Sequence, residues 1–531
     1  MHEWWRAAVL YQIYVRSFAD SNGDGIGDLS GVIAHLDHLS WLGVDGIWLS
    51  PTFPSPNADW GYDVADYFGV HPDLGTQDDL DALIAAGDER GIRVLLDLVP
   101  NHTSIAHPWF QDSRSSRTSQ YRDWYVWADP APDGGPPNNW VSSFSGSAWT
   151  LDESPAPGEP AQYYLHNFLD SQADLNWWNR AVRDEFDRNL RHWFDRGVAG
   201  FRIDVAHMII KDADLRDNPP ATDDDFLLDR LRGQVPVYNS NRPEVHDVHR
   251  HWRTIAEGYD PSKLLLGETF VGGLEEVIPY YGANDELGLA FNIPFLQAPF
   301  ETATLCALVE ETERLLRDDC TPVWTGSNHD VSRGPTRWAG GNTDAFRCAL
   351  VMLLTLRGSA VLYYGDEIGL PDTDVPDARL LDAVTIRLHR LIDRDAARTP
   401  MPWTAGAGAG FTVAGAEPWL PFGDVAACNV ADQRDDPDST LHLTRDLLSL
   451  RKERADLRTG AYRTRVCEGS VWAWQRGNDV LVALNLGPKV ASIDDVEGSI
   501  LLGTDRGRDG ARVTGVLTLG AYEGVVLSRT A

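Results

Sequence analysis

The sequence predicts an α/β fold, namely a (β/α)8 (TIM) barrel with an irregular insertion after its third strand and a C-terminal antiparallel β domain. Three observations lead to this prediction. Short apolar runs that end in polar residues recur through the first 370 positions, and amphipathic stretches with helical spacing separate many of them. The last part of the chain changes to short alternating runs between Gly and Asp turns, which is typical of antiparallel strands.

Seven of the apolar runs are predicted to be parallel barrel strands, and one more, the sixth in chain order, is expected near Leu287–Asn292. The seven are Val9–Tyr14, Gly46–Leu49, Arg93–Leu98, Gly200–Val205, Leu264–Glu268, Pro322–Ser327 and Ala360–Tyr364. Helices are predicted at Leu29–Leu42, Leu80–Arg90 and Asn179–Arg196, where apolar residues recur every three or four positions. Strands and helices that alternate in this way predict a parallel sheet, and eight repeats close a barrel.

Two segments interrupt the alternation. Residues 104–170 are rich in Pro, Gly, Ser, Asp and Trp and predict an irregular insertion, and Gly365–Asp436 predicts a long loop after the eighth strand. Leu441–Arg454 is expected to be the last barrel helix. The predicted units are a catalytic barrel of residues 1–103 and 171–456, an insertion of residues 104–170, and a C-terminal β-sandwich of residues 457–531 with strands near Ser470–Gln475, Val480–Asn485, Ser499–Leu502 and Tyr522–Ser528.

The composition limits the partners. There are 79 acidic residues against 46 Lys and Arg residues, so the formal net charge is −33, which would repel nucleic acid and an anionic membrane surface. The five cysteines are widely spread without CxxC spacing and predict neither a disulfide framework nor a zinc site. We find no signal-peptide pattern and no apolar run near membrane-spanning length, so we expect a cytoplasmic protein. The oligomeric state is left open.

Polar side chains follow four of the predicted strands. A single Asp in such a place is usually a helix cap or a solvated loop residue. Carboxylates at the same end of several parallel strands are different, because a barrel brings those ends round one mouth. Burying several acids together is costly unless Arg202, His102 and His329 offset their charge, which favours a functional site. The polar residues are Asp97, Asn101 and His102 at the end of the third strand and just after it, Arg202 and Asp204 at the end of the fourth, Glu268 at the end of the fifth, and Asn328, His329 and Asp330 at the end of the seventh.

Three acids beside Arg and His suit cleavage of a glycosidic bond. A retaining mechanism needs an ionised carboxylate that attacks the anomeric carbon and a second carboxyl, with a raised pKa, that protonates the departing oxygen. The two carboxyl groups should lie about 5–5.5 Å apart. Arg202 lies two residues before Asp204 and therefore on the same face of the strand, where it can keep Asp204 ionised.

Together these clusters resemble the signature regions of the family 13 glycoside hydrolases, the α-amylase family. Gln172-Ala-Asp-Leu-Asn176 resembles the QPDLN signature of the group of oligo-1,6-glucosidases and α-glucosidases, and Ala397-Arg-Thr-Pro-Met-Pro-Trp403 resembles the same group. The likeness covers essentially the whole chain. It implies an exo-acting retaining α-glucosidase that releases glucose from the non-reducing end of short α-glucosides.

The resemblance also implies roles for single residues. Asp204 would be the nucleophile, Glu268 the acid/base, and Asp330 a third carboxylate that grips the hydroxyls of the sugar undergoing cleavage. Arg394 would close the pocket, as in exo-acting members. The other residues that would hold the same sugar are Asp59, Tyr62, His102, Arg202 and His329.

The sequence departs from the group's pattern at three positions. Ala173 stands where the QPDLN signature has Pro, and Phe270 stands where oligo-1,6-glucosidases often have Pro. Val205 directly follows Asp204; in this group Val there tends to accompany α-1,6 preference, and Ala or Thr accompanies α-1,4 preference. The residues around Val205 differ from those of the oligo-1,6-glucosidases, so the linkage preference stays open.

The stretch from Asp20 to Asp28 places oxygen ligands at alternate positions, as a hard cation requires. It is not an EF-hand, because Gly31 occupies the twelfth position. The family resemblance implies a structural Ca²⁺, or sometimes Mg²⁺, at this loop and away from the sugar. Its ligands would be Asp20, Asn22, Asp24, the carbonyl of Ile26, and Asp28. We find no phosphate-binding motif and expect no organic cofactor.

Two other functions were weighed. A transglucosylase, or an isomerase of the trehalose synthase type, uses the same covalent intermediate but passes the glucosyl group to a sugar in place of water, and the motifs separate these outcomes poorly. A non-catalytic sugar-binding or transporter-associated barrel would have lost the acids at positions 204, 268 or 330, yet all three are present.

Overall fold

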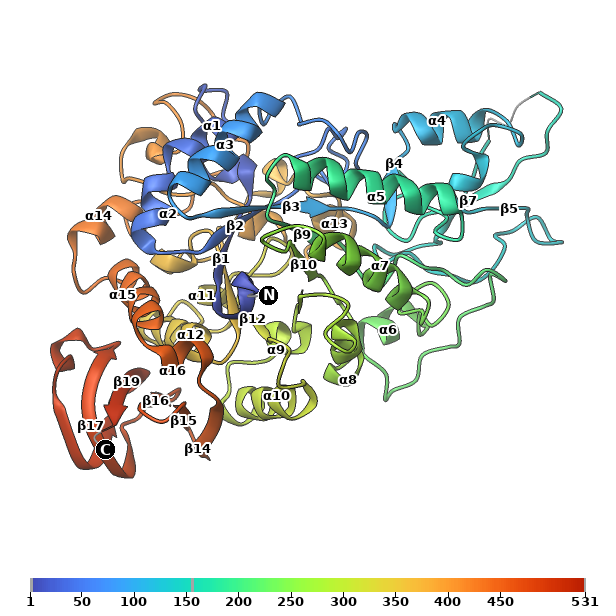
Figure 1. Cartoon of the computed structure of the whole chain (residues 1–531). Coiled ribbons are helices and arrows are strands. Elements are labelled where there is room, and N and C mark those ends of the chain that lie inside the picture. The colour runs from blue at the N-terminus through green and yellow to red at the C-terminus, as the bar shows by residue number, and fades with distance from the viewer. Residues whose placement is uncertain (1–2, 154–156, 530–531) are drawn as a thin grey trace.

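The computed structural model describes residues 3–153 and 157–529. Its centre is a sheet of eight parallel strands, and a parallel bridge between Phe291 and Val323 joins the two ends of that sheet into a barrel (Figure 1). The predicted (β/α)8 barrel is confirmed, and each strand lies within two residues of its predicted bounds. The strands are β1 (Val9–Ile13), β2 (Gly46–Leu49), β3 (Arg93–Leu98), β9 (Gly200–Ile203), β10 (Leu264–Gly267), β11 (Leu289–Ala290), β12 (Val323–Thr325) and β13 (Ser359–Tyr363).

Alternate side chains of the barrel strands belong to two different apolar cores. Leu10, Trp48 and Leu95 pack with Val361 in a cluster that fills the barrel interior. Their neighbours along each strand, such as Tyr11, belong to the larger core between the barrel and its helices. Because side chains fill the interior, a substrate can be bound only at the ends of the strands.

Helices surround the barrel and cover the outer core. The predicted helix Leu29–Leu42 is divided in two, because His35 leaves the helical region (φ −108°, ψ 7°) where its ring packs on Trp403. The main helices are α1 (Leu29–Ala34), α2 (Leu36–Leu42), α3 (Gln77–Glu89), α5 (Arg180–Asp195), α7 (Val245–Glu257), α10 (Thr302–Leu315), α12 (Thr343–Thr355) and α15 (Thr440–Glu453). Shorter helices are α8 (Leu274–Val277), α9 (Ile293–Gln297), α11 (Gly334–Arg337) and α16 (Ala455–Thr459).

The predicted insertion after the third strand projects from one end of the barrel, at the right of Figure 1. Its base is an antiparallel pair of β4 (His102–Ser104) with β8 (Gln172–Asp174). Polar side chains of both strands of this pair lie near the carboxyl end of β3. The rest holds α4 (Pro108–Ser115) and a three-stranded sheet of β5 (Trp127–Ala128), β6 (Trp149–Leu151) and β7 (Tyr163–Leu165).

Two long connections border the same end of the barrel. Residues 204–244, between β9 and α7, contain only the short helix α6 (Leu227–Arg232). Residues 364–439, between β13 and α15, contain α13 (Ala383–Arg387), α14 (Val430–Asp435) and several 3₁₀ turns. The sequence predicted the second connection as a long loop but gave no sign of the first.

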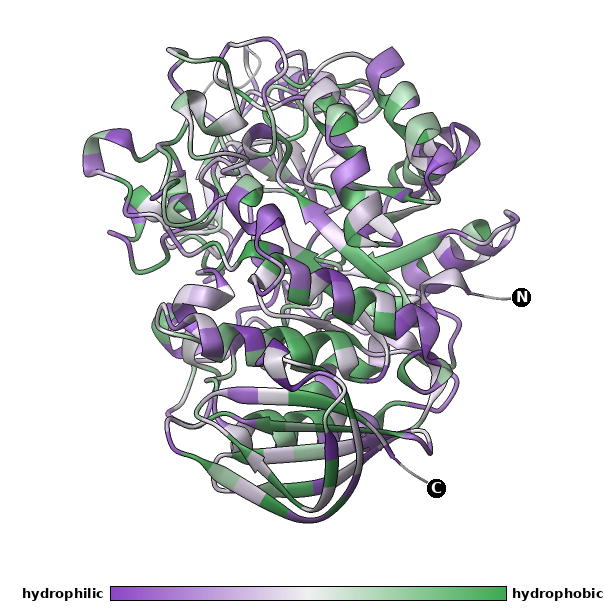
Figure 2. Cartoon of the chain, turned by 90° about the vertical axis from the view of Figure 1, so that its left-hand side faces the viewer, coloured by the Kyte–Doolittle hydropathy of each residue, from purple (hydrophilic) through white to green (hydrophobic). Residues whose placement is uncertain are grey.

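The C-terminal strands form one antiparallel sheet of six strands beneath a layer of helices (Figure 2), which confirms the predicted antiparallel β domain. Trp472 and Trp474 pack into the core shared with the barrel helices, whereas Val471 and Ala473 pack into a second core. The bounds of the three predicted units remain predictions. In sheet order the strands are β14 (Tyr462–Glu468), β15 (Val471–Arg476), β16 (Val480–Asn485), β19 (Glu523–Arg529), β17 (Ala491–Gly503) and β18 (Arg512–Leu519).

Across the described residues, we find no helix whose length and apolar character would let it span a membrane.

Candidate active site

A cavity of about 1490 Å³ opens at the carboxyl ends of the barrel strands. Seven of the nine residues predicted for catalysis and sugar binding line it. Arg202 and His329 lie behind this wall and contact it. The seven are Asp59, Tyr62, His102, Asp204, Glu268, Asp330 and Arg394.

The backbone of two neighbouring strands places Asp204 and Glu268 side by side. Each acid is the first residue after its strand, β9 or β10. The N–H of Asp204 donates to the carbonyl of Leu98 (2.8 Å), and the N–H of Glu268 donates to the carbonyl of Ile203 (2.9 Å), so the ladder of hydrogen bonds continues through both residues. The next residue, Val205, has a positive φ of 34° and donates its N–H to Glu268 Oε2 (3.0 Å). This strained turn fixes the two carboxyl groups relative to each other.

One guanidinium joins the two acids. Arg202 Nη1 lies 2.8 Å from Asp204 Oδ1, and Arg202 Nη2 lies 2.7 Å from Glu268 Oε2. Arg202 Nη1 also contacts Asp97 Oδ1 at 2.9 Å. Because the guanidinium is rigid and planar, Asp204 and Glu268 are held on adjacent arms of one fork.

Burial raises the pKa of Asp204 well above its usual range; Arg202 opposes this rise and Glu268 adds to it. Burial also raises the pKa of Asp97 to about 7 against the pull of Arg202. Arg202 therefore contacts Asp204 as expected from the sequence. However, burial raises the pKa of Asp204 by more than Arg202 lowers it. Three carboxyl groups share a single positive charge, so this set retains a proton at neutral pH.

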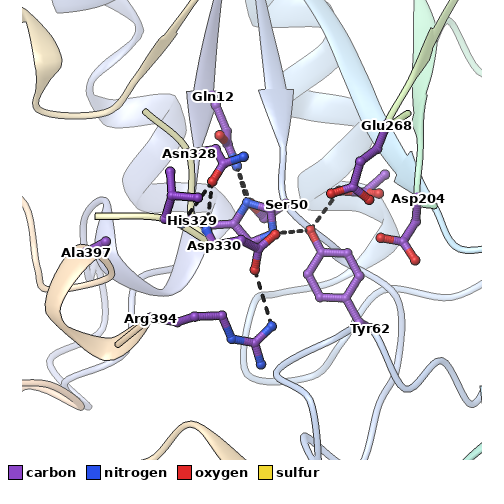
Figure 3. A network of polar contacts seen from close by, with 12 residues as sticks. Gln12, Ser50, Tyr62, Asp204, Glu268, Asn328, His329, Asp330, Arg394 and Ala397 are labelled. Atoms are coloured by element: carbon purple, nitrogen blue, oxygen red, sulfur yellow. Dashed lines mark hydrogen bonds and ion pairs between the residues drawn. The ribbon is translucent and has the colours of Figure 1, made fainter. Parts of the chain in front are cut away.

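Asp330 lies across the cavity from these two acids, beside Arg394 (Figure 3). Arg394 Nη1 and Arg398 Nη2 contact Asp330 Oδ1 at 3.2 and 3.0 Å, and His329 Nε2 lies 3.1 Å from Asp330 Oδ2. Despite burial, the positive charges of Arg394 and Arg398 hold the pKa of Asp330 well below its usual range. Asp330 is therefore ionised, and its place in the cavity lining allows it to accept hydrogen bonds from a molecule bound there.

Arg394 lines the cavity and joins two loops of its wall. Its Nη2 contacts Asp59 Oδ1 at 2.8 Å, so the loop after β2 is tied to the long connection after β13. Asp59 Oδ2 also accepts from Gln172 Nε2 (3.1 Å), on β8 at the base of the insertion. Burial raises the pKa of Asp59 to about 6, while Arg394 opposes the rise.

The two predicted histidines do not supply positive charge to the site. Burial lowers the pKa of His102 to about 4 and that of His329 to about 3. Both rings are therefore neutral near pH 7, contrary to the expectation that they offset the charge of the acids. They act as hydrogen-bonding groups: His329 Nδ1 lies 2.8 Å from Gln12 Nε2, and His102 Nε2 lies 3.1 Å from the carbonyl oxygen of Tyr62.

One fully buried acid of this network, Asp382, was not predicted from the sequence. Its Oδ1 accepts from Arg394 Nε (3.0 Å) and lies 3.5 Å from Arg398 Nη1. Its Oδ2 accepts from the N–H of Thr385 (2.7 Å) at the start of α13. Despite burial, Arg394 and Arg398 lower the pKa of Asp382 to about 2. Arg398 belongs to the motif Ala397–Trp403 and could have been predicted from it. No sequence signal marks Asp382.

An apolar surface lies next to Asp204. Phe144, Phe168, Val205 and Met208 form one cluster, and all four line the cavity. Apolar surface of this kind packs against the C–H faces of a sugar ring, while the charged groups opposite bind hydroxyls.

In the predicted metal loop, the Asp side chains accept hydrogen bonds from nearby backbone N–H groups. Asp20 accepts N–H groups of Gly23 and Gly25 (2.7 and 2.8 Å), and Asp28 accepts the N–H of Gly31 (2.7 Å). In the stretches 3–153 and 157–529, no group of three or more His, Cys, Asp and Glu side chains is arranged to hold a metal ion. The donor chemistry of the five predicted ligands nevertheless suits Ca²⁺, because all are oxygens and three belong to carboxylates. Calcium stays a prediction.

The chain is similar to known proteins over most of its length. A family model described as the catalytic domain of alpha amylase matches residues 12–460. A probable alpha-glucosidase of Rhizobium meliloti (strain 1021) is 40% identical over 91% of this chain and 89% of its own length. An oligo-1,6-glucosidase of Heyndrickxia coagulans is 36% identical over 95% of this chain and 96% of its own length.

Among solved structures, the alpha-glucosyl transfer enzyme XgtA is similar over the full length of both chains. Its TM-score is 0.92 and its sequence identity is 39%.

Proposed function

The chain belongs to the alpha-amylase family of glycoside hydrolases, family 13, and we propose that it is an exo-acting retaining α-glucosidase. It would release glucose from the non-reducing end of short α-glucosides. The observation that supports this proposal is the bridge that Arg394 forms with both Asp59 and Asp330 in the cavity wall, which would close that end of the cavity. A cavity closed there has room for one terminal sugar beside the acids, whereas an open cleft would admit the middle of a chain.

In the proposed first step, Asp204 attacks the anomeric carbon and forms an ester with the glucosyl group. The bond from that carbon to the departing oxygen breaks, and Glu268 gives its proton to this oxygen. The proton is available because the carboxyl groups around Arg202 cannot all ionise together. The reactive state has the proton on Glu268 and none on Asp204, and the positive charge that develops on the sugar stabilises the Asp204 carboxylate as it attacks.

In the proposed second step, water attacks the same carbon and gives a proton to Glu268, and the ester to Asp204 breaks. Two displacements return the original configuration at the anomeric carbon. Asp330 would bind hydroxyls of the same sugar, because Arg394 and Arg398 keep it ionised and fixed in place. Neutral His102 and His329 would add hydrogen bonds without adding charge.

Glucosyl transfer is the second candidate, and the volume of the cavity favours it. A volume of about 1490 Å³ exceeds the usual range of about 300–1,000 Å³ for a ligand pocket, so an acceptor could be bound beyond Glu268 in place of water. The similarity to XgtA, an alpha-glucosyl transfer enzyme, supports this candidate. An isomerase of the trehalose synthase type would use the same intermediate.

The products of several disaccharides separate the candidates. Maltose, isomaltose, sucrose and trehalose would be incubated with the enzyme side by side, and free glucose and new saccharides would be measured. Hydrolysis predicts two monosaccharides from each cleaved disaccharide, even at high substrate concentration. New oligosaccharides or a rearranged disaccharide as the main product would contradict hydrolysis and support transfer or isomerisation. The relative rates would also report the linkage preference.

A further inference from the structure

Two cysteines that are far apart in the chain meet where the barrel packs on the C-terminal sheet. Cys306 lies on α10 and Cys467 on β14, and this helix packs against this strand (Figure 1). Cys306 is buried, Cys467 is exposed, and both thiols are free. No short spacing relates the two residues, so the pair cannot be recognised from the sequence.

A β-bulge turns Cys467 toward α10. Side chains alternate between the two faces of a strand, so Thr464 and Cys467, three positions apart, would normally lie on opposite faces. The register of β14 against β15 shifts between Thr464 and Val466. On one side of this bulge Thr464 is opposite Trp474, and on the other side Cys467 is opposite Trp472. Both tryptophans belong to the core shared with the barrel helices, so their partners on β14 face the barrel as well.

The thiol of Cys306 contacts this face of β14. It forms side-chain hydrogen bonds with Cys467 and Thr464. Burial raises the pKa of the Cys306 thiol, and the neighbouring Cys467 and Glu310 raise it further. Cys306 is therefore protonated near pH 7, and the exposed Cys467 is the thiol of the pair that a dissolved reagent reaches first.

We propose that Cys306 and Cys467 are a modification site, at which a low-molecular-weight disulfide such as oxidised glutathione converts the two thiols into a disulfide between α10 and β14. The bond would fix β14, which is an edge strand of the C-terminal sheet, to the barrel. It would also close a long loop and so restrict the unfolded chain. Neither cysteine lines the cavity, so this proposal is independent of the proposed function.

The reaction consists of two thiol–disulfide exchanges. In the first, the Cys467 thiol loses its proton and its sulfur attacks oxidised glutathione, which gives a mixed disulfide on Cys467 and releases one glutathione thiol. In the second, the Cys306 thiol loses its proton and its sulfur attacks the sulfur of Cys467, which releases the other glutathione thiol. Two protein thiols are oxidised and one glutathione disulfide is reduced. The second exchange is favoured because the two cysteines are already held side by side.

The test counts thiols in the full-length protein. Reduced protein is incubated with oxidised glutathione and denatured, its free thiols are blocked with N-ethylmaleimide, and the intact mass and the proteolytic peptides are measured. We expect two of the five cysteines to be protected, no bound glutathione, and a linked pair of peptides that contains Cys306 and Cys467. Dithiothreitol should restore all five thiols. We expect the melting temperature to rise by about 3 °C on oxidation.

Two variants serve as controls. Cys467→Ser removes the exposed thiol, so all four remaining cysteines should stay free and the melting temperature should not respond to oxidised glutathione. Cys428→Ser removes a half-buried cysteine outside the pair and should form the disulfide as the unaltered chain does. Five free thiols after oxidation, a lasting glutathione adduct on Cys467, or a disulfide that joins two chains through Cys467 would overturn the proposal.

Discussion

At the scale of single residues, Arg202 determines how many protons the site holds. Its guanidinium contacts Asp97, Asp204 and Glu268 within 3 Å, so one positive charge faces three carboxyl groups. Full ionisation would leave two uncompensated negative charges in a buried place, which is costly. The buried histidines cannot help, because their pKa values lie well below 7. Retention of a proton follows from the arrangement, and a general acid requires it.

Asp97 provides a test of this electrostatic argument. Asp97→Asn removes one negative charge from the set, so the remaining carboxyl groups lose their proton more easily. We expect the alkaline limb of the pH profile of kcat/KM to move to lower pH by about one unit. The control is Thr269→Ser, which alters a neighbouring residue outside the charge network. Glu268→Asp would not serve, because it shortens one of the acids. An alkaline limb that stays in place or moves to higher pH in Asp97→Asn would contradict the argument.

Asp382 is expected to act as a positioning residue for Arg394 and Arg398. Asp382→Asn keeps the shape of the side chain but removes its negative charge. We expect kcat/KM to fall about tenfold or more. The Asp382 carboxylate also raises the pKa of Asp59. Without that charge the pKa of Asp59 falls, so the acid limb of the pH profile should move to lower pH.

Thr385→Val is the matched control for Asp382. It removes the hydroxyl that donates to Asp382 Oδ2 (2.8 Å) and accepts the backbone N–H of Arg394 (3.0 Å), but it leaves the carboxylate and its contact with the Arg394 guanidinium. A purely structural role for Asp382 predicts that both variants lose stability and activity together with unchanged acid limbs. That result would refute the positioning role.

The sequence located the main acids because each follows an apolar run that reads as a barrel strand. Asp204 and Glu268 are then brought together by the topology alone. The protonation states could not be foreseen, because they depend on burial and on contacts between residues distant in sequence. Asp382 was missed for the same reason: it caps α13 in a connection without periodicity, and only the fold brings it to Arg394.

At the scale of elements, prediction succeeded where a segment has one dominant apolar pattern. The helix predicted at Asn179–Arg196 is found as α5, whose N-cap Asn179 accepts the N–H of Ala181. The split between α1 and α2 was not predicted, because the packing of His35 on Trp403 involves residues far apart in the chain. Residues 204–244 were not recognised as part of the cavity wall, since they lack any period and contain only α6.

The loop from Asp20 to Asp28 is the element whose prediction most needs an experiment. If it binds calcium, the ion favours the folded state, so the melting temperature rises with added Ca²⁺ and falls with a chelator. Asp24→Ala, which removes an exposed predicted ligand, should abolish this response while kcat at 25 °C stays unchanged, because the loop is not part of the cavity lining. A melting temperature that is the same in Ca²⁺ and in chelator would show that the loop holds no calcium.

At the scale of the whole molecule, the insertion and the C-terminal sheet lie on opposite sides of the molecule (Figure 1). The insertion contributes His102 and Gln172 to the site through β4 and β8. The C-terminal sheet instead packs on the barrel helices; Arg347 of α12 donates to the carbonyl of Thr504 (2.6 Å), which follows β17. The sheet therefore supports the barrel at a distance from the chemistry. The place where this sheet packs on the barrel could not be predicted, because local sequence patterns indicate strands but not the surface against which a sheet packs.

The central claim is that Asp204 forms a covalent bond with the sugar while Glu268 transfers the proton. The most direct measurement is mass spectrometry of the Glu268→Gln variant after mixing with α-glucosyl fluoride, whose leaving group departs without a proton from the enzyme. The first step then proceeds and the second is slow, because no base activates water. We predict a protein heavier by one glucosyl unit, with the label on the peptide that contains Asp204. A label on another carboxyl group, or release of glucose of inverted configuration without any adduct, would contradict the account.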